Sequence, residues 1–153
     1  MKQRVYIDTS IVGGFFDEEF SEATKKLFER LIKGEIIFVL SDLMGFELTK
    51  APLRVKKLLS KYPQECFEHV ELTEESVNLA NLYIKEGVVG KANIEDCRHI
   101  AIATINKVDV LASWNFKHIV NLDKIKGYNS VNYRYGYQMI EIRSPKDLIY
   151  YEN

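Results

Sequence analysis

The sequence has few cysteines, almost no net charge and no hydrophobic run long enough to cross a membrane. Its only two cysteines, Cys66 and Cys97, form no CxxC pair and are too few for a disulfide scaffold. We therefore expect both to be reduced, buried thiols in a cytoplasmic protein. The chain also lacks the histidine and cysteine spacing of a zinc site.

The start of the chain does not have the pattern of a signal peptide. A predicted strand begins almost at once, without a charged segment followed by an apolar one. We therefore expect neither secretion nor insertion into a membrane.

The overall charge indicates no particular class of partner. The formal net charge is -1, with 28% charged and 46% hydrophobic residues, which is ordinary for a globular protein. A local basic surface is still open, because 21 Lys and Arg are available and their placement decides the local field. The length of 153 residues predicts one domain, residues 1–153, without repeats or linkers.

What the sequence does contain is a regular alternation of short apolar runs and helical patterns. Strands are predicted at Arg4–Ile7, Ile36–Leu40, Phe67–Leu72 and Val108–Ser113, with a late strand at Ile140–Ile142. Their order with the helices between them predicts an α/β fold, a three-layer α/β/α sandwich around a central, mostly parallel sheet.

Helical patterns fill the segments between these strands. A helix is predicted from Ser21 to Lys33, one is capped by Ser41 or Asp42, and another runs from Leu53 to Leu59. Thr73 is predicted to open another helix, and Asn93 to cap one that reaches about Asn106. The segment 122–135 is predicted to be either a helix or irregular.

Four polar side chains are predicted to meet at one edge of this sheet. Asp8 follows the first strand, Glu47 lies on the helix after the second, Asp96 is in the first turn of a later helix, and Asn115 follows the fourth strand. Three carboxylates placed together would repel one another unless a cation intervenes. Mg²⁺ and Mn²⁺ prefer such oxygen ligands, and a site of this kind fits phosphodiester hydrolysis.

Neighbouring polar residues are candidates for auxiliary roles. Thr9 or Ser10 is expected to hold a water at the ion through its hydroxyl group. His99, one helical turn beyond Asp96, is expected to contact the substrate phosphate or to hydrogen-bond a metal-binding side chain.

These residues lie in four segments whose order and spacing resemble the PIN-domain family, including VapC-like toxins. The segments are YIDTS, SDLMGFEL, EDCRHIAIA and LASWNFKHI, and the resemblance covers nearly the whole chain. It implies a Rossmann-like sandwich, Mg²⁺- or Mn²⁺-dependent endoribonuclease activity, frequent homodimers and, in the toxin branch, a small antitoxin partner. Asp8, Glu47 and Asp96 match the acidic positions of the family.

Asn115 departs from the family pattern, because many members have aspartate at this position. An amide oxygen can bind a hard cation but brings no charge, so the number of ions, one or two, stays open. Asp109 is a poor substitute, since it is expected at the opposite end of the fourth strand. Asp123 is a more conceivable one, but the family pattern does not support it.

Each candidate residue also has a structural interpretation. Asp8 can be a helix cap, Asp96 can interact with the helix dipole, Glu47 can be a solvated residue and Asn115 can form a turn. Core packing is the default for Trp114 and Phe116, with base stacking as the alternative. A basic run forms either a solvated helix face or a path for RNA: Lys50, Arg54, Lys56 and Lys57. A group of tyrosines packs either a late helix or a dimer interface: Tyr128, Tyr133, Tyr135 and Tyr137.

Three other functions compete with a ribonuclease. A catalytically weak or inactive domain that binds RNA or protein is indicated by the missing acid at Asn115. An aspartyl phosphatase of the haloacid dehalogenase type would use Asp8 as nucleophile, but a second acid would be needed where Ser10 stands. Dinucleotide binding is disfavoured, because Gly13-Gly14 does not make the glycine-rich fingerprint.

Overall fold

Five parallel strands form the centre of the protein, in the order β3-β2-β1-β4-β5. The structure is a computed structural model and describes residues 2–150. The strands are β1 (Gln3–Ile7), β2 (Ile36–Ser41), β3 (Phe67–Val70), β4 (Val110–Ala112) and β5 (Ile142–Arg143). The predicted parallel sheet is therefore confirmed.

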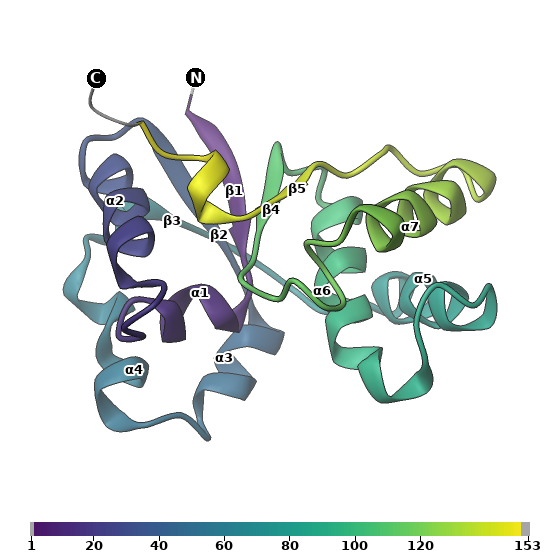
Figure 1. Cartoon of the computed structure of the whole chain (residues 1–153), viewed down its shortest axis with the longest axis horizontal. Coiled ribbons are helices and arrows are strands. Elements are labelled where there is room, and N and C mark those ends of the chain that lie inside the picture. Colours follow the sequence, from purple (N-terminus) through teal and green to yellow (C-terminus); the bar gives the residue numbers. More distant parts are fainter. Residues whose placement is uncertain (1, 151–153) are drawn as a thin grey trace.

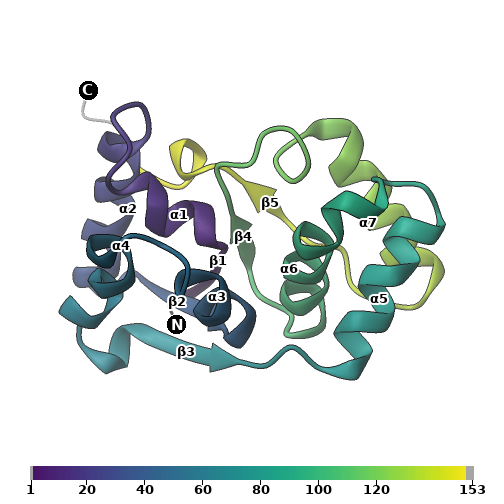
Figure 2. The ribbon, with the colours of Figure 1, turned by 90° about the horizontal axis from the view of Figure 1, so that it is seen from below.

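Helices cover both faces of the sheet, as Figures 1 and 2 show. One face carries α1 (Thr9–Gly14), α2 (Ser21–Ile32) and α4 (Leu53–Lys57), and the other carries α5 (Glu74–Lys85), α6 (Ile94–Ile105) and α7 (Leu122–Arg134). The helix α3 (Asp42–Leu48) borders both layers, because Leu43 belongs to one core and Met44 to the other. The predicted three-layer α/β/α sandwich is confirmed.

The alternation of side chains along β1 creates the two cores. Val5 and Ile7 pack toward α1 and α2, while Tyr6 between them packs toward α5 and α6. All three side chains are fully buried. A strand covered on both faces has this continuous apolar character, which is why the period-2 pattern is absent from its sequence.

Several predicted boundaries differ from the structure for local reasons. The predicted strand Ile140–Ile142 begins only at Ile142, because both backbone groups of Ile140 are bound by the side chain of Asn129. Asn93 was expected to cap α6, but its side chain makes no capping bond; the short turn Lys91–Asn93 runs directly into the helix. Ser41, in contrast, caps α3 by accepting a hydrogen bond from the backbone N–H of Met44.

The sheet places its carboxyl-end residues together and Asp109 far from them. The backbone N–H of Arg4 donates to Asp109 Oδ2 at 2.6 Å, so Asp109 lies at the start of β1 and β4, as predicted. Cys66 and Cys97 are buried free thiols, also as predicted. Within residues 2–150, we find no helix with the length and apolar character needed to cross a membrane.

Candidate active site

Asp8 lies directly after β1 and is almost completely buried. It occupies the N-cap position of α1, yet its side chain makes no capping bond to the helix backbone. Instead, Oδ1 accepts a hydrogen bond from Ser10 Oγ at 2.5 Å and Oδ2 accepts one from Ser113 Oγ at 2.6 Å. The carboxylate is thus held by hydroxyl groups of two segments far apart in the sequence, which is more than helix capping requires.

Ser113 also connects Asp8 to Asp96. Its hydroxyl oxygen accepts the backbone N–H of Asn115 at 3.0 Å, and Asn115 Nδ2 donates to Asp96 Oδ2 at 3.3 Å. A continuous path of hydrogen bonds therefore joins the two acids. The sequence prediction that Asp8, Asp96 and Asn115 lie at one edge of the sheet agrees with this geometry.

Asn115 also forms a turn, as its structural interpretation predicted. Its Oδ1 accepts the backbone N–H groups of Lys117 and His118, at 3.2 and 2.9 Å. An amide oxygen has two lone pairs, and both are used here. Binding a cation through this oxygen would therefore require the turn to release at least one of these bonds.

Glu47 reaches the same edge from α3 and is not simply solvated. Its Oε1 accepts a hydrogen bond from Thr9 Oγ1 at 2.7 Å and lies 2.5 Å from His99 Nε2. His99 is only 3% exposed, and its other ring nitrogen lies 2.6 Å from the hydroxyl of Tyr6. Tyr6 in turn donates to Ser41 Oγ at 2.9 Å. The carboxylate of Glu47 is therefore fixed by a buried polar chain.

The three acids experience different electrostatic environments. Burial raises the pKa of Asp8, although the charge of His99 and the two serine hydroxyls oppose the shift. Burial and then the charge of Asp8 raise the pKa of Asp96. Burial also acts to raise the pKa of Glu47, but the hydrogen bond and charge of His99 outweigh it, so this pKa is lowered. Glu47 is ionised at neutral pH, while the charge of Asp8 disfavours the ionised form of Asp96.

Comparison with known proteins identifies the fold. No protein-family model and no curated protein matches the chain. Among solved structures, a toxin-antitoxin complex from Klebsiella pneumoniae matches with a TM-score of 0.54 at 15% identity, over 74% of this chain and 88% of the other. VapBC2 from Rickettsia felis bound to a promoter DNA fragment matches with a TM-score of 0.56 at 12% identity, over 93% and 98%.

A third structure, DNA-bound VapBC from Salmonella typhimurium, matches with a TM-score of 0.57 at 13% identity, over 95% of this chain and 99% of the other. The chain has a PIN-like fold. The resemblance predicted from the four sequence segments is thus confirmed at the level of the fold, and the chain spans nearly the full length of these neighbours.

The PIN-like fold brings every predicted site residue to one edge of the sheet. Asp8, Asp96 and Asn115 share one hydrogen-bonded path, and Glu47, Thr9 and His99 share another. The two paths meet at the start of α1, where Asp8 and Thr9 are adjacent. Across residues 2–150, however, no three His, Cys, Asp or Glu side chains are arranged to hold a metal ion.

Sequence reasoning missed Ser113 and Tyr6. Tyr6 had a detectable signal, because alternate residues of a strand share a face and Tyr6 is two residues before Asp8. Ser113 had a weaker one, as a hydroxyl residue at the end of a strand beside Asn115. Trp114 packs as the default interpretation predicted: it is buried, stacked on Phe20 at 4.2 Å between ring centroids. Its face is therefore not free for a base.

Proposed function

We propose that this PIN-like chain is a divalent-metal-dependent endoribonuclease. The observation that carries the proposal is the path from Asp8 through Ser113 and Asn115 to Asp96, which holds two carboxylates from distant segments at one sheet edge. Such a convergence of acids is costly to folding and is typical of a functional site.

The donor set fits Mg²⁺ or Mn²⁺. Asp8, Asp96 and Glu47 offer only carboxylate oxygens, which hard divalent cations prefer, and no thiol or zinc-type histidine pair lies among them. A positive ion would also offset the repulsion that raises the pKa of Asp96. We propose Asp8 and Asp96 as the primary ligands and Glu47 as the third, while Asn115 as a fourth ligand stays a prediction.

The protein's own groups would divide the remaining work. Ser10 and Ser113 fix the orientation of the Asp8 carboxylate, and Thr9 and His99 fix that of Glu47. Glu47 keeps its negative charge at neutral pH and can accept a proton from an attacking water. When bound, the divalent ion would supply a Lewis acid that neutralises charge on the phosphoryl oxygens.

We further propose that the chain acts as the toxin of a toxin-antitoxin pair and forms homodimers. The similar structures are toxin-antitoxin or VapBC complexes, which supports a small protein partner. The buried free thiols Cys66 and Cys97 suit the reducing cytoplasm.

A binding module without turnover is the second candidate, and Asn115 favours it. The neutral amide uses its oxygen for a turn and its nitrogen for Asp96, so the site has one carboxylate fewer than many PIN-domain proteins. Titration calorimetry with Mn²⁺ separates the candidates. Absence of ion binding, together with RNA binding that leaves the RNA intact, would favour the module.

Cleavage of single-stranded RNA tests the main proposal. The purified protein is expected to make internal cuts with Mn²⁺ or Mg²⁺ and to stop when a chelator is added. Asp8→Asn and Asp96→Asn should each lose cleavage while remaining folded. Asp109→Asn is the matched control, because it removes the same charge at the opposite edge of the sheet. Full activity in both site variants would refute the proposal.

A further inference from the structure

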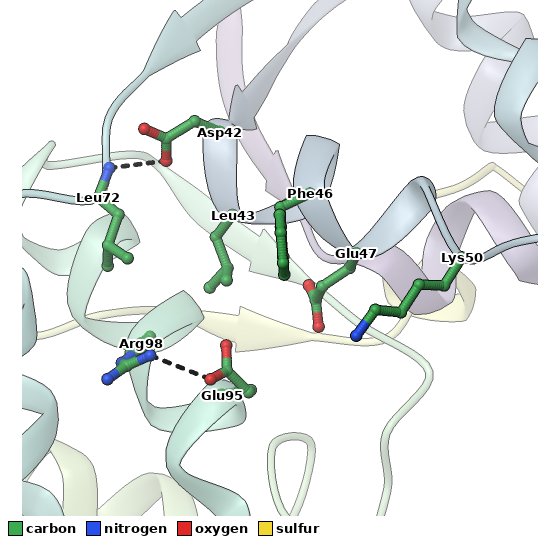
Figure 3. Close-up of a pocket in the computed structure, with 8 residues that line it drawn as sticks. All are labelled: Asp42, Leu43, Phe46, Glu47, Lys50, Leu72, Glu95 and Arg98. Atoms are coloured by element: carbon green, nitrogen blue, oxygen red, sulfur yellow. Dashed lines mark hydrogen bonds and ion pairs between the residues drawn. The ribbon is translucent and has the colours of Figure 1, made fainter.

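A pocket of about 790 Å³ opens beside Glu47, between α3 and the first turns of α6 (Figure 3). Glu47 is at the same time a wall of this pocket and a member of the candidate active site. A molecule in the pocket would therefore lie next to the reacting bond. The lining residues are Asp42, Leu43, Phe46, Glu47, Lys50, Leu72, Glu95 and Arg98.

Phe46 gives the pocket an exposed aromatic ring, with Lys50 Nζ over it. Its side chain is 65% exposed, although it directly precedes Glu47 on α3. Leu43 and Leu72 continue the apolar surface in Figure 3. Trp114, a second aromatic group near the acids, is buried against Phe20 and donates its indole N–H to Thr24. Phe46 is thus the better placed of the two for contact with a flat apolar ligand.

Cationic groups stand on both sides of this aromatic face. Lys50 Nζ lies 5.5 Å from the centroid of the Phe46 ring. Arg98 projects from α6 on the opposite wall, where Nη1 donates to Glu95 at 3.0 Å, while its buried Nε has no hydrogen-bond partner in the described structure. The Arg98 side chain is 30% exposed, so its guanidinium can exchange Glu95 for another anion.

The acids of the pocket are largely committed to other partners. Asp42 Oδ1 accepts the backbone N–H of Leu72 at 2.8 Å, and Glu95 is paired with Arg98. Glu47 has Thr9 and His99 as partners. The lining still has three carboxylates against two cations. A ligand phosphate next to Phe46 would therefore need direct contact with Lys50 and, in exchange for Glu95, with Arg98.

An exposed aromatic ring with cations beside it matches one unpaired nucleotide. Its base can stack on the ring and its phosphate can contact the cations, whereas a base in a duplex is already stacked on both sides. Resting on the ribonuclease function proposed above, we propose that this pocket binds a nucleotide of single-stranded RNA beside the scissile bond, with the base on Phe46 and the phosphate between Lys50 and Arg98.

Binding to an RNA that stays intact tests this site directly. The Asp8→Asn protein is mixed with a short single-stranded RNA carrying the fluorescent base 2-aminopurine, whose emission falls on stacking. Adding Phe46→Ala should lower affinity by roughly 5- to 150-fold and abolish the quenching. Phe46→Trp should retain both, because it preserves an aromatic face.

Tyr133→Ala is the matched control for Phe46→Ala. It removes an aromatic ring that is 82% exposed, from α7 and outside this pocket, and should leave affinity unchanged. Both variants are on the surface, so both are expected to fold. Lys50→Gln should weaken RNA binding and reduce its salt dependence by about one released counterion. Lys50→Arg should retain both the affinity and the salt dependence, because it keeps the positive charge.

The outcomes distinguish this inference from the ribonuclease proposal. If the unmodified chain cleaves RNA with Mn²⁺ but Phe46→Ala binds RNA as Tyr133→Ala does, the inference alone is wrong. Equal affinity for duplex and single strand would also overturn it. The same holds if Phe46→Ala weakens capture of a protein partner and leaves RNA binding unchanged, since the pocket would then be a peptide site. If the unmodified chain neither cleaves nor binds RNA, both proposals fail.

Discussion

The ring of His99 lies between Glu47 and Tyr6, with Nε2 2.5 Å from Glu47 Oε1 and Nδ1 2.6 Å from the tyrosine hydroxyl. Both rings are almost fully buried. Because a histidine has one ring nitrogen for each partner, the bond on one side decides how the other nitrogen is used. Tyr6 thereby helps to orient the carboxylate of Glu47 without touching it.

Tyr6→Phe is therefore expected to reduce RNA cleavage by about 10- to 100-fold, the usual effect of losing a group that orients a ligand. Tyr83→Phe is the control, because its hydroxyl is equally buried and donates to Asn132 at 2.6 Å in the same core. Each variant loses about 1 to 3 kcal/mol of folding free energy. Steady-state cleavage rates of the two, at matched stability, check the prediction. Equal activity would show that Tyr6 has only a packing role.

Asp8→Asn is expected to stabilise the protein while it abolishes cleavage. Burial raises the pKa of Asp8, and burial together with the charge of Asp8 raises the pKa of Asp96. The neutral amide keeps hydrogen-bonding groups for Ser10 and Ser113 without the charge. We expect a gain of about 1 to 2 kcal/mol in chelator, measured by urea unfolding.

Mn²⁺ should reverse that order of stability. An ion that binds only the folded state raises the unfolding temperature of the unmodified chain but not that of Asp8→Asn. Asp109→Asn again provides the comparison at the far edge. An Asp8→Asn protein that is less stable than the unmodified chain in chelator, or that gains equally from Mn²⁺, would contradict this account.

An ion pair between Arg4 and Glu68, at the opposite edge of the sheet, is expected to make folding stability depend on pH. Arg4 binds Glu68 through two hydrogen bonds, of 2.9 and 2.5 Å. This hydrogen bonding is the main reason why the pKa of Glu68 is lowered. A lowered carboxyl pKa stabilises the folded state above the ordinary glutamate range, and that contribution is lost as pH falls through the lowered value.

Glu68→Gln should therefore lower stability near neutral pH by less than about 1 kcal/mol, because both side chains are partly exposed, and the difference should vanish in acid. Urea unfolding at a series of pH values measures it. Glu65→Gln removes the same charge from an exposed glutamate just before the same strand and is the comparison. A Glu68→Gln deficit that persists in acid would rule out the ion pair as its cause.

The strand-end residues of the site could be predicted because strand ends follow from the sequence pattern. Asp8 comes directly after one apolar run and Asn115 shortly after another, and in a parallel sheet those ends share an edge. The partners of these residues could not be predicted in the same way. Whether Ser113 turns its hydroxyl toward Asp8 depends on side-chain rotamers and on the neighbouring strand, neither of which has a sequence period.

The strand boundary at Ile140 shows a second limit. Its residues have the composition of a strand, yet Asn129 from α7 binds its backbone N–H and C=O in place of a neighbouring strand. A contact between segments that are not adjacent strands overrides local propensity, and no local pattern announces it. The overall layers were predictable for the opposite reason, since alternating strands and helices leave few topologies.

Two adjacent glycines in α1 provide the last prediction. A Cβ atom at Gly14 would lie 2.7 Å from two atoms of the Trp114 ring, while one at Gly13 would meet nothing within 4 Å. Gly14→Ala should therefore destabilise the protein by about 1 to 3 kcal/mol through overpacking. Gly13→Ala should stabilise it by up to about 1 kcal/mol, because alanine favours the helix.

The displaced ring would also disturb the site. The backbone N–H of Trp114 donates to Ser10 Oγ, which in turn donates to Asp8. Gly14→Ala should consequently shift the fluorescence of Trp114, the single tryptophan, and reduce RNA cleavage. Gly13→Ala should change neither. If both variants unfold at the same urea concentration with unchanged fluorescence, the close packing of Gly14 against Trp114 does not constrain the site.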